Sequence, residues 1–144
     1  MNEAEGFGAG DALATQPMEK PFAIESIGGY PVFRVTGDVD FSNQPDFDAA
    51  LRGLDPGAAT AVIVSFEECT FFDSSIVGVL MKYWRWPERA WDAVLVTKSE
   101  NPANRVFDIV GIDQVYPVEH SLGRAVERAM EIAAARERRP ASSG

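Results

Sequence analysis

A run of β-branched and aromatic residues in the middle of the chain, TAVIVSF (60–66), constrains the fold most strongly. A continuous apolar run of this length is typical of a strand that is buried on both faces, in the centre of a sheet covered by helices. The segment that follows it, residues 74–86, carries two apolar stripes at helical spacing and is therefore apolar over a wide arc. We expect a central strand and a helix that packs against the sheet.

The rest of the chain alternates between strand-like and helix-like patterns. Gly28-Gly29 separates two short alternating segments, which predicts an antiparallel hairpin. The expected strands are residues 22–27, 30–37, 60–66, 93–97 and 114–118. The expected helices begin near Asn43 or Gln44, at the serines 74–75, at Pro102 and near His120, and Pro87 is expected to end the second of them. The order β-β-α-β-α-β-α-β-α predicts one α/β domain with a mixed, mostly parallel sheet and helices packed on it.

We expect three regions along the 144 residues. Residues 1–20 mix Gly, Ala, Pro and acidic residues without a period, which is typical of a flexible leader. Residues 21–137 form the folded domain, and residues 138–144 form a frayed tail.

Composition excludes several classes of function. The net charge of −9 argues against a nucleic-acid or anionic-membrane surface, because both need clustered Lys and Arg. No apolar run approaches the roughly 20 residues of a membrane-spanning helix, so we expect no direct membrane contact. The single cysteine, Cys69, is expected to be a packing or loop residue, and no secretion signal is recognisable, which predicts a cytoplasmic protein. Charge does not indicate the oligomeric state.

Catalytic equipment is not recognisable in the sequence. A serine hydrolase needs a base beside its nucleophile, but the only histidine, His120, is placed at the expected cap of the last helix, and GxSxG is absent. A receiver domain is disfavoured because Lys98 follows the wrong strand. One His, one Cys and scattered carboxylates give no metal-ligand spacing, and no glycine loop cradles a nucleotide. We therefore expect no enzyme activity, cofactor or metal.

The segment FDSSI (72–76) leaves two alternatives open. Serines at the start of a helix usually cap it by accepting hydrogen bonds from backbone N–H groups. Alternatively, one hydroxyl stays reachable, and a phosphate added there is stabilised by the positive end of the helix dipole. The residues themselves favour the cap.

Three segments, GDVDFSNQ, VIVSFEECTFFDSSIVGVL and NPANRVFDIVGIDQVYPVEHSLGRAVE, occur in an order and spacing that resemble the STAS domain of anti-sigma factor antagonists, from about residue 22 to residue 133. The resemblance implies a small sheet with packed helices and a role in partner switching. The unphosphorylated antagonist binds an anti-sigma factor, usually a serine protein kinase; phosphorylation releases it, and a phosphatase restores binding.

Carried onto this chain, the resemblance implies that Ser74 is the phosphorylated residue. It also implies that Asp73 orients the turn, that Ser75 lies beside the acceptor, and that Asp38 and Asp40 belong to the kinase-facing surface. In this role the protein is a substrate of the kinase and does not itself catalyse.

Ile76 departs from the family pattern, which commonly has glycine after the two hydroxyl residues. A β-branched side chain is expected to add bulk beside the acceptor, so that Ile76 shapes the partner-binding surface and limits access of a kinase. The alternative function is then a phosphorylation-independent STAS scaffold.

The aromatic segment KYWRWPERAW (82–91) suggests a further alternative, a transporter-associated or ligand-binding STAS module, because dense aromatic residues can anchor an interface. The simpler expectation is that Trp84 and Trp91 pack in the core while Trp86 covers a turn.

Overall fold

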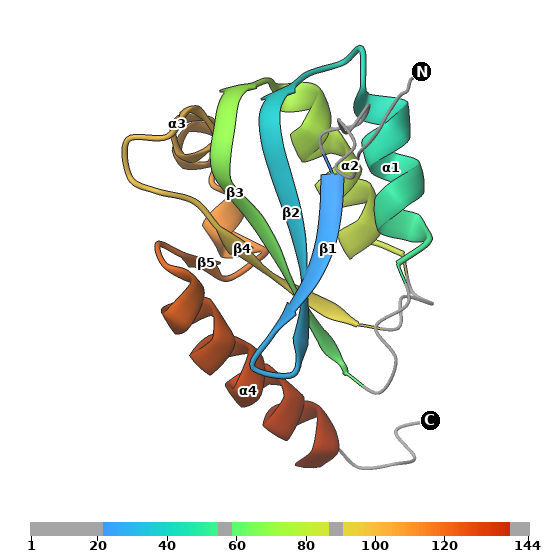
Figure 1. Cartoon of the computed structure of the whole chain (residues 1–144), viewed down its shortest axis with the longest axis vertical. Coiled ribbons are helices and arrows are strands. Elements are labelled where there is room, and N and C mark those ends of the chain that lie inside the picture. The colour runs from blue at the N-terminus through green and yellow to red at the C-terminus, as the bar shows by residue number, and fades with distance from the viewer. Residues whose placement is uncertain (1–21, 55–58, 87–90, 139–144) are drawn as a thin grey trace, which may run out of the picture.

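The computed structural model describes residues 22–54, 59–86 and 91–138, which form one α/β layer structure (Figure 1). Five strands and four α-helices follow one another in the predicted order, so the predicted fold class is confirmed. The strands are β1 (Phe22–Ile27), β2 (Tyr30–Val39), β3 (Ala61–Phe72), β4 (Asp92–Val96) and β5 (Val118–Glu119). The helices are α1 (Gln44–Arg52), α2 (Ser74–Trp84), α3 (Pro102–Val110), the short 3₁₀ helix η1 (Ile112–Gln114) and α4 (Leu122–Arg138).

The sheet is mixed, and its strands lie side by side in the order β1-β2-β3-β4-β5. The hairpin of β1 and β2 is antiparallel, and the three other pairs are parallel. The turn of the β1–β2 hairpin contains Gly28 and Gly29. Both have positive φ (62° and 85°), a conformation that glycine adopts at low cost. The parallel pairs place the carboxyl ends of β2 and β3 at one edge of the domain.

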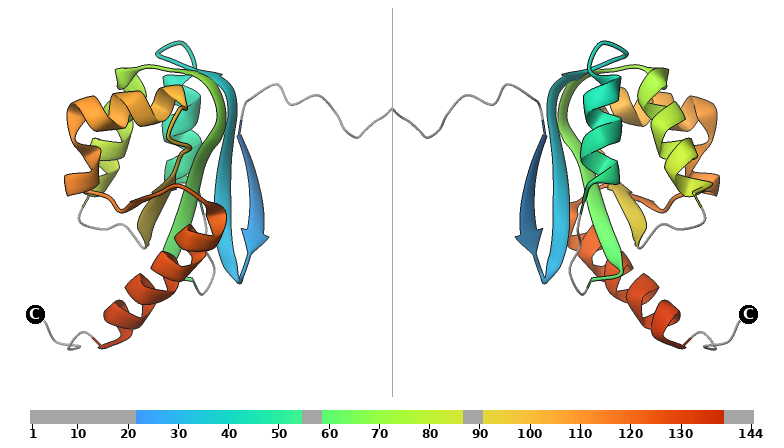
Figure 2. Two further views of the ribbon diagram at one scale, coloured as in Figure 1. Left: turned by 90° about the vertical axis from the view of Figure 1, so that its left-hand side faces the viewer. Right: turned by 90° about the vertical axis from the view of Figure 1, so that its right-hand side faces the viewer.

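Two separate cores form, one on each face of the sheet. Helices α1, α2 and α3 cover one face, where they lie together in Figure 2, and their apolar stripes meet alternate residues of β2, β3 and β4. Helix α4 covers the other face, where Ala125 and Ala129 belong to one buried cluster with Val32, Ile63 and Val94. This two-sided cover explains why residues 61–66 are all buried, as the apolar run predicts.

Helix α3 begins at Pro102, where the sequence predicts. Asn101 is its N-cap, because the Asn101 side chain accepts a hydrogen bond from Ala103 N (2.8 Å), and Pro102 occupies the first turn. The Asn101 amide also donates to the carbonyl oxygens of Phe66, Glu67 and Cys69, at 3.1–3.2 Å. These bonds attach the start of α3 to β3.

Two predicted strands differ most from the structure. Strand β3 runs on to Phe72, six residues beyond the predicted end at Phe66, because its pairing with β2 continues through a bulge to Val39↔Phe72. The last strand is Val118–Glu119 rather than 114–118, because residues 112–114 form η1. Pro87, the predicted end of α2, lies outside the described residues, as do the expected leader and the expected tail beyond Arg138.

The aromatic segment is only partly in the core. Trp91 is buried, as predicted, and Trp86 is partly buried against the core. Trp84 is 40% exposed, so its predicted core position is wrong. Helix α2 turns its buried face, which includes Ile76, Val79, Leu80 and Tyr83, toward the sheet, and Trp84 falls outside that arc. In the residues described, no helix is both long and apolar enough to cross a membrane.

Candidate functional site

The start of α2 is capped by Asp73 and not by a serine. Asp73 has extended backbone angles, and its Oδ1 accepts hydrogen bonds from Ser75 N (2.9 Å) and from the Ser75 hydroxyl. This carboxylate satisfies an N–H of the first helical turn and places negative charge at the positive end of the helix dipole. The expectation that the serines themselves cap the helix is therefore wrong.

Asp73 also joins α2 to the loop between β2 and α1. Its Oδ2 accepts a hydrogen bond from Phe41 N (3.2 Å), and its own N–H donates to Val39 O (3.3 Å). One side chain thus holds together two segments that are 32 residues apart in the sequence. This arrangement supports the expectation that Asp73 orients the turn.

The loop between β2 and α1 is organised around Asp40. The Asp40 carboxylate accepts hydrogen bonds from the hydroxyl of Ser42 (2.6 Å) and from Ser42 N (2.9 Å). These bonds hold the pKa of the Asp40 carboxyl below its usual value, because they stabilise the charged form. Asn43 accepts from Asp40 N (2.9 Å) and donates to Asp38 O (3.0 Å), so its side chain fixes the loop and makes no cap hydrogen bond with α1.

Asp38 lies next to this loop, near the carboxyl end of β2. Its carboxylate accepts a hydrogen bond from the Thr70 hydroxyl (2.7 Å) of β3, and Asp38 itself pairs with Phe71 in the sheet. The structure therefore brings Asp38, Asp40 and Asp73 to the same edge of the domain, although Asp73 is more than 30 residues from the other two in the sequence.

Ser74 is the first residue of α2, and its side chain is exposed to solvent. Within the described part of the chain, its hydroxyl makes no hydrogen bond, whereas the neighbouring Ser75 is half-buried and bound to Asp73. Of the two serines, only Ser74 presents a hydroxyl that is free to react.

Ile76 does not take part in the exposed region around Ser74. Its side chain is completely buried in the core between α2 and the sheet. Residues two positions apart on a helix do not face each other, so Ile76 points away from the exposed side of Ser74. The predictions that Ile76 adds bulk beside Ser74 and contacts a partner are both wrong. Ile76 therefore does not limit the access of a kinase to Ser74.

Two exposed phenylalanines near Ser74 were not singled out by sequence reasoning. Phe41, in the loop bound by Asp73, is 74% exposed, and Phe71, near the end of β3, is 49% exposed. Large apolar side chains in such positions often mark protein-binding surfaces. The available signal was the pair Phe71-Phe72, since successive strand residues point to opposite faces and only one of the two rings can join the core under α1, α2 and α3. We call Phe41, Phe71 and Ser74 the Ser74 surface.

Cys69 and His120, the other reactive side chains considered in the sequence, lie outside the Ser74 surface. Cys69 is buried, and this burial, with a smaller contribution from the charge of Asp38, raises the pKa of its thiol to about 12. His120 Nδ1 donates to Thr97 O (2.7 Å), while the Ser121 hydroxyl accepts from Arg124 N (3.2 Å) at the start of α4. The predicted cap role of His120 is therefore wrong. Across the described ranges, no cluster of three or more His, Cys, Asp or Glu side chains is arranged to hold a metal ion.

Comparison with known proteins assigns the fold to a family. The family model described as "Mlab, STAS domain" matches residues 22–123, and the chain belongs to the STAS domain family. An anti-sigma factor antagonist from Mycobacterium paratuberculosis, known from a crystal structure, is 18% identical with a TM-score of 0.62; the alignment covers 78% of this chain and 92% of that one. This neighbour shows the same fold.

A second structural neighbour is the anti-sigma factor antagonist SpoIIAA in its unphosphorylated form. It is 25% identical with a TM-score of 0.57, and the alignment covers 76% of this chain and 96% of that one. A comparison with curated protein sequences found no match. The resemblance to the STAS domain of anti-sigma factor antagonists is thus confirmed at the level of family and fold.

Proposed function

We propose that this protein is an anti-sigma factor antagonist that works by partner switching. In its unphosphorylated form it binds an anti-sigma factor with serine kinase activity through the Ser74 surface. Phosphorylation of Ser74 releases that partner, and a phosphatase reverses the change. The structural neighbours, which are anti-sigma factor antagonists, support the general role.

The observation that carries the proposal is the division of labour between the two serines. Asp73 and Ser75 supply the helix cap, so the Ser74 hydroxyl is left exposed and without a hydrogen bond in the described chain. A phosphate on Ser74 brings nearly two negative charges to an edge that already holds Asp38, Asp40 and Asp73. Two exposed phenylalanines lie on adjoining segments, Phe41 in the loop bound by Asp73 and Phe71 three residues before Ser74, and they suit an apolar partner surface.

A second candidate function is a STAS module that binds its partner without phosphorylation. The observation that favours it is the exposure of Phe41 (74%) and Phe71 (49%), which offers apolar contacts to a partner whether or not Ser74 is modified. The Ser74 surface serves such a module equally well, with Phe41 and Phe71 as its anchors.

A pull-down from lysate of the native organism distinguishes the two. Wild type, Ser74→Ala and Ser74→Asp are used as bait, Ser75→Ala is the matched control, and captured proteins are identified by mass spectrometry. Partner switching predicts that wild type, Ser74→Ala and Ser75→Ala capture an ATP-binding serine kinase or another anti-sigma factor, which Ser74→Asp loses. Capture of the same partner by all four baits contradicts partner switching and supports the constitutive module.

A further inference from the structure

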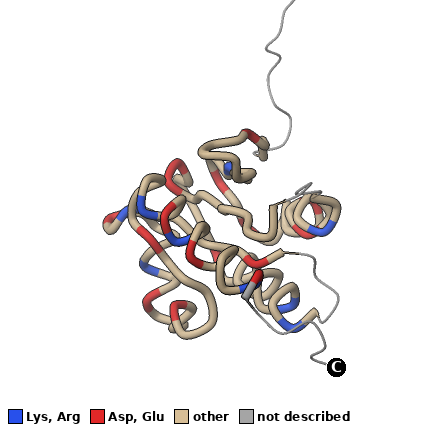
Figure 3. Tube along the Cα trace, turned by 90° about the horizontal axis from the view of Figure 1, so that it is seen from below, with Lys and Arg blue, Asp and Glu red and all other residues tan. Residues whose placement is uncertain are grey.

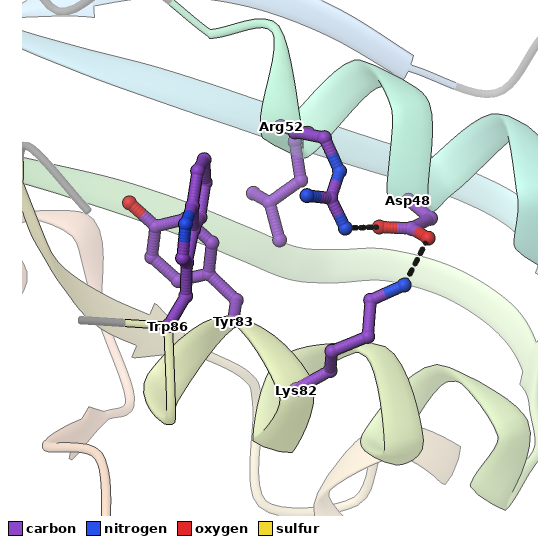
Figure 4. A pocket seen from close by; sticks show the side chains of 6 residues that line it. Asp48, Arg52, Lys82, Tyr83 and Trp86 are labelled. Carbon is purple, nitrogen blue, oxygen red and sulfur yellow. Dashed lines mark hydrogen bonds and ion pairs between the residues drawn. The ribbon is translucent and has the colours of Figure 1, made fainter. Parts of the chain in front are cut away.

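A pocket of about 200 Å³ lies between the carboxyl-terminal halves of α1 and α2 (Figure 4). Its lining residues are Asp48, Leu51, Arg52, Lys82, Tyr83 and Trp86. Lys82 follows Ser74 by eight positions on α2, a rise of about 12 Å at 1.5 Å per residue. The pocket is therefore separate from the Ser74 surface.

The apolar part of this pocket is built from rigid side chains. Leu51 and Tyr83 are buried, and Trp86 stands edge-on to Tyr83 with ring centroids 5.5 Å apart. Tyr83 in turn stacks on the buried Trp91 at 4.4 Å, which anchors the aromatic wall to the core. A wall held in this way loses little conformational freedom when a ligand binds.

The charged part carries an excess of positive charge. The Asp48 carboxylate is shared by two cations, with Lys82 Nζ at 2.7 Å from Oδ2 and an Arg52 guanidinium nitrogen at 3.6 Å from Oδ1. Among the lining residues that the structure describes, one carboxylate and two cations leave a net charge of +1. The Arg52 guanidinium also lies 5.1 Å from the Trp86 ring centroid, and both cationic side chains are about half exposed. In a protein of net charge −9, whose acidic and basic residues are interspersed along the backbone (Figure 3), this small excess of positive charge suits an anion.

We propose that this pocket binds a small aromatic carboxylate. The ring lies against Leu51, Tyr83 and Trp86, and the carboxylate faces Lys82 and Arg52. A cavity of about 150 Å³ accommodates a benzene ring, so the volume suits one ring with a short acidic arm. We expect binding to need both parts of the pocket. The apolar wall alone does not select one aromatic ring over another, and the attraction between the exposed cations and an anion is weakened by salt.

The test is a titration of the full chain with phenylacetate, followed by amide and indole N–H chemical shifts in NMR spectra. We expect saturable shifts confined to the signals of Trp86, Tyr83 and their neighbours on α1 and α2. The neutral analogue phenylacetamide is expected to bind more weakly, and added salt is expected to weaken phenylacetate alone.

Variants of opposite charge should change the Kd for phenylacetate in opposite directions. Lys82→Gln removes one positive charge and is expected to raise the Kd for phenylacetate about twofold to fivefold, the range of exposed ion pairs. Asp48→Asn removes the competing carboxylate and is expected to lower the same Kd by a similar factor. Lys98→Gln, an exposed lysine outside the pocket, and Ser74→Ala are expected to leave the Kd unchanged.

Two results overturn the proposal: no saturable shift in the pocket, or equal affinities of phenylacetate for the wild type, Lys82→Gln and Asp48→Asn. Equal binding of phenylacetate and phenylacetamide overturns the role of the charged part. Because Ser74→Ala is included, a failure here is distinguishable from a failure of partner switching, which is read from the pull-down.

Discussion

Replacing Asp73 and Ser74 by alanine, one at a time, should change the free energy of unfolding by very different amounts. Asp73→Ala removes the N-cap of α2, which typically costs about 1 kcal/mol. It also removes the acceptor for Phe41 N, worth about 0.5–1 kcal/mol at this exposed position. The sum is about 2 kcal/mol. Ser74→Ala removes an exposed hydroxyl that makes no hydrogen bond with the described residues, so we expect a change within about 0.5 kcal/mol.

Thermal unfolding followed by circular dichroism measures both changes. For a domain of roughly 120 residues the unfolding entropy is about 0.25 kcal/mol/K, so 1 kcal/mol shifts the Tm by about 4 °C. Asp73→Ala should therefore lower the Tm by about 8 °C, and Ser74→Ala by less than about 2 °C. Asp73→Asn is the matched control, because asparagine keeps a cap acceptor and should lose less. An equal loss of stability in Ser74→Ala and Asp73→Ala would refute the assignment of the cap to Asp73.

Further predictions concern four other residues. Cys69 should react with a thiol reagent only after unfolding, because burial and a pKa raised to about 12 keep its thiol protonated; rapid modification of the native protein would contradict its burial. Asp40→Asn should make the Tm fall less steeply with acid below about pH 4. The lowered pKa of Asp40 stabilises the fold at pH values above the pKa of the unfolded state, and this contribution is lost as the pH falls through the pKa of the folded state. An unchanged dependence of the Tm on pH would argue against the Ser42 hydrogen bonds. Phe41→Ala should weaken capture of the partner in the pull-down without lowering the Tm by more than about 2 °C, since the ring is 74% exposed; undiminished capture would remove Phe41 from the surface. Ile76→Gly should destabilise the fold by at least about 3 kcal/mol in chemical denaturation, because it empties a core position inside a helix; a near-normal stability would contradict the burial of Ile76.

Local chemistry explains which parts of the fold could be predicted from the sequence. The hairpin turn followed from Gly28-Gly29, and the start of α3 followed from Pro102, because these residue types suit the backbone angles found there. The central strand followed from its unbroken apolar run, which only a sheet covered on both faces can bury.

Features that depend on tertiary contacts could not be predicted in the same way. The polar segment after Phe66 stays in β3 because it pairs with β2, as in Thr36↔Glu68, and no local pattern shows this. Asp73 and the two serines are all good N-cap residues, so the sequence does not decide which one caps α2. The loop contact from Phe41 N to Asp73 holds the turn in place, and it joins segments 32 residues apart.

The candidate site could be predicted in part. The resemblance indicated Ser74, Asp73 and the two acidic residues near the end of β2, and the structure brings them to one edge of the domain, while their roles remain predictions. Ile76 was misjudged because a departure from a family pattern does not reveal which way the side chain points, and this direction depends on the rotation of α2 against the sheet.

The most direct test of partner switching is the affinity of the captured anti-sigma factor for two forms of this protein, one unmodified and one with phosphoserine installed at position 74. Isothermal titration calorimetry gives both dissociation constants. The account predicts that the unmodified protein binds and that phosphorylation of Ser74 raises the Kd by at least about tenfold, equivalent to about 1.4 kcal/mol. Equal affinities of the unmodified and Ser74-phosphorylated forms would contradict it.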